Sequence, residues 1–108
     1  SIKNFLIKKK FKIIEDNNYS KSNYWINVVI LKNFNGIHHN KLVNSLIKKN
    51  MEVRYVWYPN HLQKPFKKYQ KYKITNALKY VQKSICLPSG LNLKSNDIYK
   101  ICKILNAK

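Results

Sequence analysis

The sequence has few acidic residues, little cysteine and no long hydrophobic run. Four Asp and Glu stand against 22 Lys and Arg, for a formal net charge of +18. The longest apolar candidate, residues 25–31, is interrupted by Asn27 and ends at Lys32, well short of the roughly 18 residues of a membrane span. The opening SIKNFLIKKKF places its lysines after a short apolar patch, the reverse of a signal peptide. We therefore expect no membrane association and no secretion, and we expect a cytoplasmic protein.

The two cysteines, Cys86 and Cys102, lie in apolar surroundings and show neither CxxC nor Cys/His ligand spacing. They are typical of small core residues in a reducing compartment. A disulfide between them stays an open alternative, although nothing else in the sequence indicates an oxidising context. No metal site is predicted.

Arginine is scarcer still, since Arg54 is the only one and the other 21 basic residues are lysines. Lys, Asn, Ile and Tyr, all encoded by A/T-rich codons, make up 57 of the 108 residues. A genome rich in A and T would produce this charge without a polyanionic partner, and nucleic-acid readers usually enlist arginine. The composition thus argues against a nucleic-acid partner, and a free-standing basic nucleic-acid-binding module is kept as the alternative function.

What is present fits one domain with a modest core, because 44% of the 108 residues are hydrophobic. Residues 1–10 place Ile2, Phe5 and Leu6 on one side of a possible helix, without an initiating Met. We expect residues 1–10 to be the tail of a longer linking helix and residues 11–108 to form the domain.

Hydrophobic patterning predicts short strands alternating with helices. The expected strands are residues 11–15, 24–31, 52–57 and 84–87. Both faces of 24–31 are largely apolar, which predicts a central strand covered on both sides. The expected helices are residues 38–49, 65–72, 75–83 and 95–105. Asn50 is expected to end the first helix in a left-handed conformation, and Thr75 and Ser95 are expected N-caps. The order predicts an α+β domain with a small, mainly antiparallel sheet and helices packed on it.

Two smaller features favour structural roles. His38 and His39 would point about 100° apart on a helix, so they are expected at an exposed helix start rather than on a shared metal. The stretch KPFKKYQKYK interleaves lysine with aromatics as single-strand binders do, but a solvated helix face with its tyrosines folded onto the core is the expected structure.

Polar side chains crowd the end of the expected strand 52–57. Arg54, His61 and Gln63 surround the exit at Pro59, where a loop can present side chains to a ligand. His61 is able to exchange a hydrogen bond with a sugar hydroxyl, or to hold an anion when it is protonated. The residues alone leave a structural role open, and such a role is the more usual one for residues at the end of a strand.

The pattern RxxWYPxHLQxxF, residues 54–66, resembles the C-terminal region of the DegT/DnrJ/StrS aminotransferases, in particular the perosamine-synthase-like and legionaminic-pathway branches. NYWINVVIL, HHNKLVNSLIKKNMEVR and SICLPSGLNLKSNDIYKICKIL resemble other pieces of that region, in the family's order. The resemblance covers roughly residues 11–107. Asn50 replaces a frequent glycine and Tyr55 a frequent proline.

The resemblance implies the C-terminal small domain of a fold type I, pyridoxal-phosphate-dependent aminotransferase. In that family the histidine matching His61 faces the active site and contacts the sugar substrate or the cofactor surroundings. Arg54, Tyr58 and Gln63 match positions close to it, so these four residues are the expected substrate-binding set. For Arg54, a structural pair with a carboxylate is an equal alternative.

The resemblance also implies an intact homodimeric enzyme that moves an amino group from an amino acid, by family habit glutamate, to a nucleotide-linked keto-sugar for surface polysaccharide or glycan synthesis. Its cofactor lysine belongs to a large domain upstream of everything in this sequence. We therefore expect this chain alone neither to hold pyridoxal phosphate nor to transaminate, and to expose the surface that packs on the large domain.

Overall fold

The computed structural model describes residue 6, residues 10–33 and residues 36–107. Its four strands form one antiparallel sheet in the order β1-β2-β4-β3. The strands are β1 (Phe11–Ile13), β2 (Asn27–Leu31), β3 (Arg54–Tyr55) and β4 (Ser84–Leu87). The α-helices are α1 (Gly36–Ile47), α2 (Ala77–Val81) and α3 (Ser95–Asn106), and the 3-10 helices are η2 (Asn60–Leu62) and η3 (Lys64–Phe66). The predicted α+β class with a small antiparallel sheet is confirmed.

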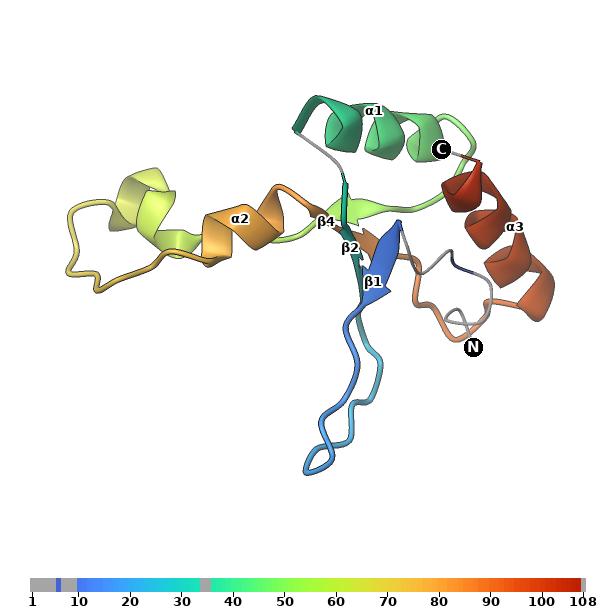
Figure 1. The fold of residues 1–108 in the computed structure, drawn as a ribbon, viewed down its shortest axis with the longest axis horizontal. Helices are drawn as coiled ribbons and strands as arrows, with labels where there is room; N and C mark the ends of the chain where they lie inside the picture. Colours follow the sequence, from blue (N-terminus) through green and yellow to red (C-terminus); the bar gives the residue numbers. More distant parts are fainter. Residues whose placement is uncertain (1–5, 7–9, 34–35, 108) are drawn as a thin grey trace.

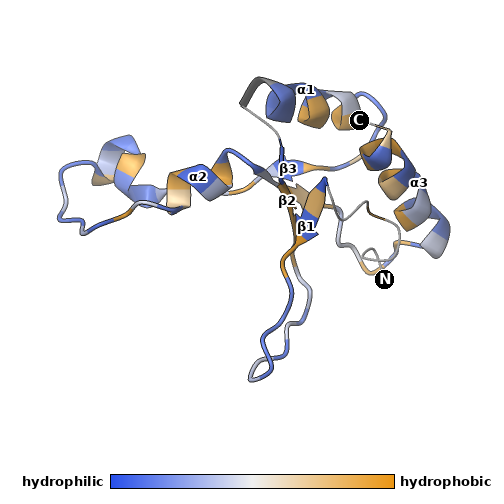
Figure 2. Ribbon diagram, viewed as in Figure 1, coloured by the Kyte–Doolittle hydropathy of each residue, from blue (hydrophilic) through white to orange (hydrophobic). Residues whose placement is uncertain are grey.

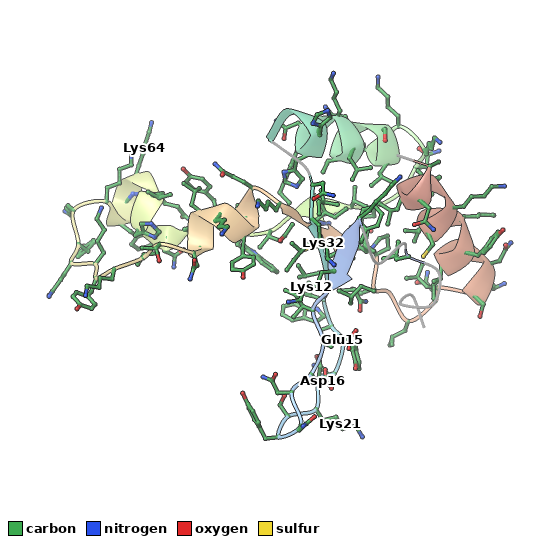
Figure 3. All side chains as sticks on the ribbon, in the orientation of Figure 1. Lys12, Glu15, Asp16, Lys21, Lys32 and Lys64 are labelled. Atoms are coloured by element: carbon green, nitrogen blue, oxygen red, sulfur yellow. The ribbon has the colours of Figure 1, made fainter. Side chains whose placement is uncertain are left out.

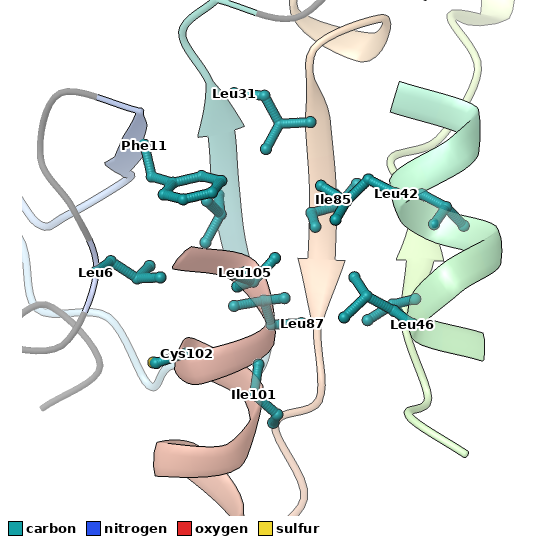
Figure 4. Close-up of a cluster of buried hydrophobic side chains, with 13 residues drawn as sticks. Leu6, Phe11, Leu31, Leu42, Leu46, Ile85, Leu87, Ile101, Cys102 and Leu105 are labelled. Carbon is teal, nitrogen blue, oxygen red and sulfur yellow. The ribbon is translucent and has the colours of Figure 1, made fainter. Parts of the chain in front are cut away.

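The core lies between one face of the sheet and the helices α1 and α3 (Figures 1 and 4). Val29 and Leu31 alternate along β2 toward this face, and both are fully buried. The residues that complete the cluster are Leu6, Phe11, Leu42, Val43, Leu46, Val53, Ile85, Leu87, Ile101, Cys102 and Leu105. Burying one such aliphatic side chain contributes about 1.5–3 kcal/mol. The amphipathic patterns of α1 and α3 are thus what attaches both helices to the sheet.

The opposite face of the sheet is only half-covered, so the expectation for strand 24–31 is wrong in two respects. The strand begins at Asn27 rather than residue 24, because Tyr24 has a left-handed backbone (φ 52°) that interrupts extended pairing. Val28 and Ile30, which point away from the core, are intermediate in exposure. α1 and α3 both pack on the other face, so neither of these helices covers these two apolar side chains.

The ends of α1 test the prediction at Asn50 and His39. Asn50 has φ 56° and follows the last turn of the helix, as predicted for a left-handed stop.

The expected exposure of the histidine pair is wrong for one member. His38 is exposed, but His39 is 4% exposed and its Nε2 lies 3.0 Å from the Ser84 carbonyl oxygen. Adjacent helical residues diverge by about 100°, so one of the pair turns to the core.

The other helix starts differ by one residue from the prediction. The N-cap of α2 is Asn76 rather than Thr75, and the N-cap of α3 is Lys94 rather than Ser95. Asp97 lies in the first turn of α3, as expected, and its Oδ2 accepts the Lys94 backbone N–H at 3.0 Å. This carboxylate satisfies a donor at the positive end of the helix.

Two segments project from the sheet and its helices: a hairpin of residues 14–26 and an arm of residues 56–83 (Figure 1). The radius of gyration is 15.2 Å, whereas a compact chain of this length has about 13 Å. Figure 3 shows Lys64 far out on the arm, away from Lys12 and Lys32 at the sheet. The arm contains η2, η3 and α2. The chain therefore carries two extensions that its own core does not enclose.

Hydrophobic side chains on the arm are open to solvent, and Figure 2 shows orange segments along it. The exposed set on the arm is Trp57, Tyr58, Phe66, Tyr69, Tyr72, Ile74, Leu78 and Tyr80. These side chains agree with the expected exposed apolar surface, and its packing on a large domain stays a prediction. By contrast, residues 65–72 do not form the predicted helix, and Tyr69 and Tyr72 are not folded onto the core (61% and 78% exposed). A short helix needs packing to persist, and the exposure of these two tyrosines shows that residues 65–72 have little of it.

Both cysteines are free thiols. Cys102 is buried in the core, and Cys86 is half-buried. Burial raises the pKa of each thiol, which disfavours the reactive thiolate. These properties suit the packing role expected from sequence.

Two further expectations concern the chain ends and the membrane. The expected linking helix falls on residues 1–10, of which only Leu6 and Lys10 are described, so it lies outside the described residues. None of the helices in the described ranges has the length and apolar composition of a membrane span.

Candidate functional site

The first turn of the arm brings together Tyr58, His61 and Gln63. Pro59, with φ −57° and ψ 130°, directs the chain out of an extended conformation into η2. The turn is closed by two backbone hydrogen bonds, from Leu62 N–H to the Pro59 carbonyl and from Gln63 N–H to the Asn60 carbonyl, both at 3.0 Å. A proline followed by a polar residue thus builds this turn locally.

The Gln63 side chain stabilises the same turn through two hydrogen bonds. Its Nε2 donates to the Tyr58 carbonyl oxygen at 2.7 Å and to Asn60 Oδ1 at 3.2 Å. Both amide protons are therefore committed within the turn, and only the amide oxygen is left to meet a ligand. The structure gives Gln63 a supporting position around His61.

Tyr58 and His61 are the groups of this turn that are able to face a ligand. The Tyr58 side chain is 52% exposed, and its hydroxyl makes no hydrogen bond within the described ranges. His61 is partly buried at the centre of η2. A phenol and an imidazole on one rigid turn are able to donate and accept hydrogen bonds to hydroxyl groups.

Arg54 lies apart from that turn, on β3. Its guanidinium donates to Glu52 Oε1 at 2.6 Å, and the two side chains are 76% and 74% exposed. This contact bears out the structural alternative, a pair with a carboxylate. Because the pair is largely solvated, its contribution to stability is small, and the exposed guanidinium can still be drawn to an anion.

A groove of about 760 Å³ surrounds Arg54 and is also lined by both tryptophans of the chain. Trp25 comes from the end of the hairpin and is 73% exposed, and Trp57 comes from the start of the arm and is 67% exposed. The sequence analysis assigned no binding role to either tryptophan, and so it missed this pair. The only available signal was that each tryptophan lies within two residues of a strand end.

The structure places three of the four predicted residues together and the fourth apart from them. Tyr58, His61 and Gln63 share a turn of the arm, whereas Arg54 lines the groove at its root, which none of the other three lines. The arrangement can bind and orient a polar ligand. Within the described residues no group of three or more His, Cys, Asp or Glu side chains is placed to hold a metal ion.

The described lysines do not fit a cofactor that needs a Schiff base. Such a lysine sits in an enclosed site where its amine is desolvated and positioned. Among the described residues every lysine is exposed or only half-buried, with Lys10 and Lys83 the least exposed. No step of catalysis is therefore assigned to any of the lysines that the structure describes.

Comparison with known proteins identifies relatives of the whole domain. Residues 4–106 match the model of the DegT/DnrJ/EryC1/StrS aminotransferase family. The fold is similar to Spr1654 of Streptococcus pneumoniae, a candidate sugar aminotransferase solved in an apo-form and a PMP-form, with a TM-score of 0.87 at 12% identity. The aminotransferase TlmJ of Streptoalloteichus hindustanus has a TM-score of 0.81 at 14% identity.

A third structure, PseC of Helicobacter pylori, is an aminotransferase involved in the biosynthesis of pseudoaminic acid and has a TM-score of 0.65 at 14% identity, covering 74% of this chain and 22% of its own. Spr1654 and TlmJ each cover 98% of this chain. Conversely, the chain spans only 27% of Spr1654 and 28% of TlmJ. It corresponds to about a quarter of the length of these structures.

Proposed function

The chain belongs to the DegT/DnrJ/EryC1/StrS aminotransferase family, and from this premise we propose that it is the C-terminal small domain of a sugar aminotransferase. The intact enzyme transfers an amino group from an amino acid, by family habit glutamate, to a nucleotide-linked keto-sugar used in surface polysaccharide or glycan synthesis. The domain supplies one wall of the substrate site.

The observation that carries this proposal is the turn of residues 58–63. It presents a phenol and an imidazole on a backbone that Gln63 braces by two hydrogen bonds. Preorganised donors and acceptors of this kind recognise hydroxyl groups with little ordering cost. We assign sugar contact to His61 and Tyr58, support to Gln63, and attraction of an anionic group to Arg54.

The remaining parts of the enzyme lie outside this domain in the proposal. Pyridoxal phosphate, when bound to the large domain, supplies the electron sink for amino transfer. The intact protein is a cytoplasmic homodimer. The exposed hydrophobic side chains of the arm support packing against another part of that enzyme, because an apolar surface of this kind marks an interaction site.

The test uses the intact enzyme that contains this domain, with His61→Asn as the variant. If His61 contacts the sugar, KM for a nucleotide-linked 4-keto-sugar should rise by roughly tenfold or more. A site built for a hydroxyl loses binding free energy when one hydrogen-bond partner is removed, and a tenfold change corresponds to about 1.4 kcal/mol. The glutamate half-reaction, followed as 2-oxoglutarate release, should be unchanged.

The matched control is His38→Asn, which changes an exposed histidine on α1. It should leave both half-reactions at the wild-type rate. Equal loss of both half-reactions in His61→Asn, or an unchanged sugar KM, would contradict the assignment. Absence of any amino transfer to keto-sugars by the intact wild-type enzyme would overturn the proposed function itself.

One observation favours the second candidate, a basic nucleic-acid-binding module. Tyr69 and Tyr72 are exposed on the arm beside lysines, in the manner of stacking platforms. A salt titration of this chain with a fluorescent oligonucleotide separates the two functions. Tight binding at physiological salt with a steep salt dependence would favour the module, and weak binding that vanishes at that salt would favour the aminotransferase domain.

A further inference from the structure

A single buried histidine contacts both ends of the arm. The arm leaves the sheet after Tyr55, the last residue of β3, and returns at Ser84, the first residue of β4. We call these two residues the neck of the arm. The ring of His39 meets Tyr55 edge to face, with centroids 5.2 Å apart, and its Nε2 lies 3.0 Å from the Ser84 carbonyl oxygen.

Ser84 is held in the sheet by its pairing with Ile30 of β2, but the Tyr55 side of the neck has little else to hold it. β3 is two residues long and pairs with β4 only at Arg54–Cys86 and Tyr55–Ile85. A two-residue edge strand resists opening weakly, because few ladder hydrogen bonds must break. Tyr55 also makes one hydrogen bond to α1, in which its hydroxyl donates to Asn40 Oδ1 at 3.1 Å.

We propose that His39 is a positioning residue that staples the two ends of the arm together and to α1. Its burial, at 4% exposure, leaves the ring little room to turn away. The arm carries the turn of residues 58–63, so the staple sets the direction in which that turn leaves the sheet. This consequence rests on the proposed function, but the staple itself does not.

The position of the staple, and not its hydrogen bond, favours a neutral imidazole. A backbone carbonyl only accepts, so Nε2 donates to Ser84 in either charge state of the ring. A second proton would place a charge in a buried position at the first turn of α1, where the positive end of the helix opposes it.

The groups around His39 add no countercharge that would change this expectation. β3 presents the Tyr55 phenol, β4 presents the uncharged Ser84, and α1 places the exposed His38 and Lys41 beside it in sequence. Burial lowers the pKa of His39 below the ordinary 6.5, and the hydrogen bond with Ser84 partly opposes this shift.

The sign of the pH effect follows from that direction. The folded chain binds the proton less readily than the unfolded chain, so the staple contributes its full stability above the unfolded value. That stability is lost as the pH falls through the lower folded pKa. Mild acid should loosen the neck while the core between β2, α1 and α3 stays closed.

The experiment is an NMR titration of the labelled 108-residue chain between about pH 7.5 and pH 5, which brackets histidine protonation. His39 should titrate below 6.5, and the amide signals of Tyr55 and Ile85 should move along the same curve. His39→Gln, which keeps a donor for Ser84 without a titrating group, should abolish the movement of these two signals. His38→Gln should leave it unchanged.

Amide exchange supplies the second readout. At the low end of the range, exchange at Tyr55 and Ile85 should accelerate severalfold in the wild type after correction for the intrinsic rate, whereas Val29 in the core should not change. If His39→Gln does not fold, the wild-type titration alone decides. Signals of Tyr55 and Ile85 that do not follow the His39 curve in the wild type, or that move equally in His39→Gln, would overturn the proposal.

Discussion

The body formed by the sheet, α1 and α3 differs from the arm in what its hydrophobic side chains contact. In the body Val29, Leu31 and Ile85 are fully buried against the chain's own residues. In the arm Trp57, Tyr72 and neighbouring aromatics are mostly exposed. The body therefore carries the stability of this chain, and the arm carries surface suited to a contact outside it. The difference shows that hydrophobic residues are placed here for two separate tasks.

The largest expected effect is on stability, from a substitution that destabilises the body and does not touch the arm. Ile85→Ala removes a side chain with no exposure from the centre of the sheet. It should lower the free energy of unfolding by about 2–5 kcal/mol, since the loss of contacts adds to the cavity left behind. Chemical denaturation followed by far-UV circular dichroism measures the change.

The matched control is Ile74→Ala, an isoleucine in the arm that is 45% exposed. This change should cost within about 0.5 kcal/mol, as for surface substitutions generally. A similar loss in both variants would show that the arm belongs to the same cooperative core, which would contradict the comparison.

An intermediate effect is expected in limited proteolysis with trypsin. Lysines occur in both regions, but residues 67–76 have no helix or strand, whereas Lys41 lies in α1 and Lys103 in α3. The first cuts should fall after Lys67, Lys68, Lys71 or Lys73, because irregular exposed backbone enters a protease cleft without unfolding. Mass spectrometry of early time points identifies the sites, and first cleavage after Lys41 or Lys103 would refute the distinction.

The smallest effect is expected at the boundary between the two regions. Glu52→Gln removes the carboxylate that binds Arg54, in a pair whose side chains are 74% and 76% exposed. The free energy of unfolding should fall by less than about 1 kcal/mol, because solvent screens the pair. A larger loss, measured by the same denaturation and compared with Glu15→Gln on the exposed hairpin, would mean that the pair helps to hold β3.

Sequence reasoning succeeded where the information is local. The alternation of Val29 and Leu31, the left-handed Asn50 and the contiguous turn around His61 each depend on residues within a few positions of one another. A helix end or a proline-led turn is set by short-range sterics and hydrogen bonds. These features could be predicted without knowing the rest of the fold.

It failed where a side chain's partner is distant in sequence. His39 meets Tyr55 and Ser84, which lie on different strands, and no local pattern separates it from the exposed His38. The tyrosines of residues 64–73 were expected on the core, but the arm carries them away from it. The hydrophobic pattern of a sequence does not distinguish a side chain that is buried within the chain from one that is exposed and contacts another surface.

By itself the sequence determined the family, the α+β class and the segment that holds the candidate site, because patterning and motif spacing are properties of neighbouring residues. Only the tertiary structure decided which sheet face is covered, that Arg54 stands apart from His61, and that His39 joins the ends of the arm. Those contacts depend on strand register and helix placement, which bring together residues such as His39 and Ser84 from separate elements.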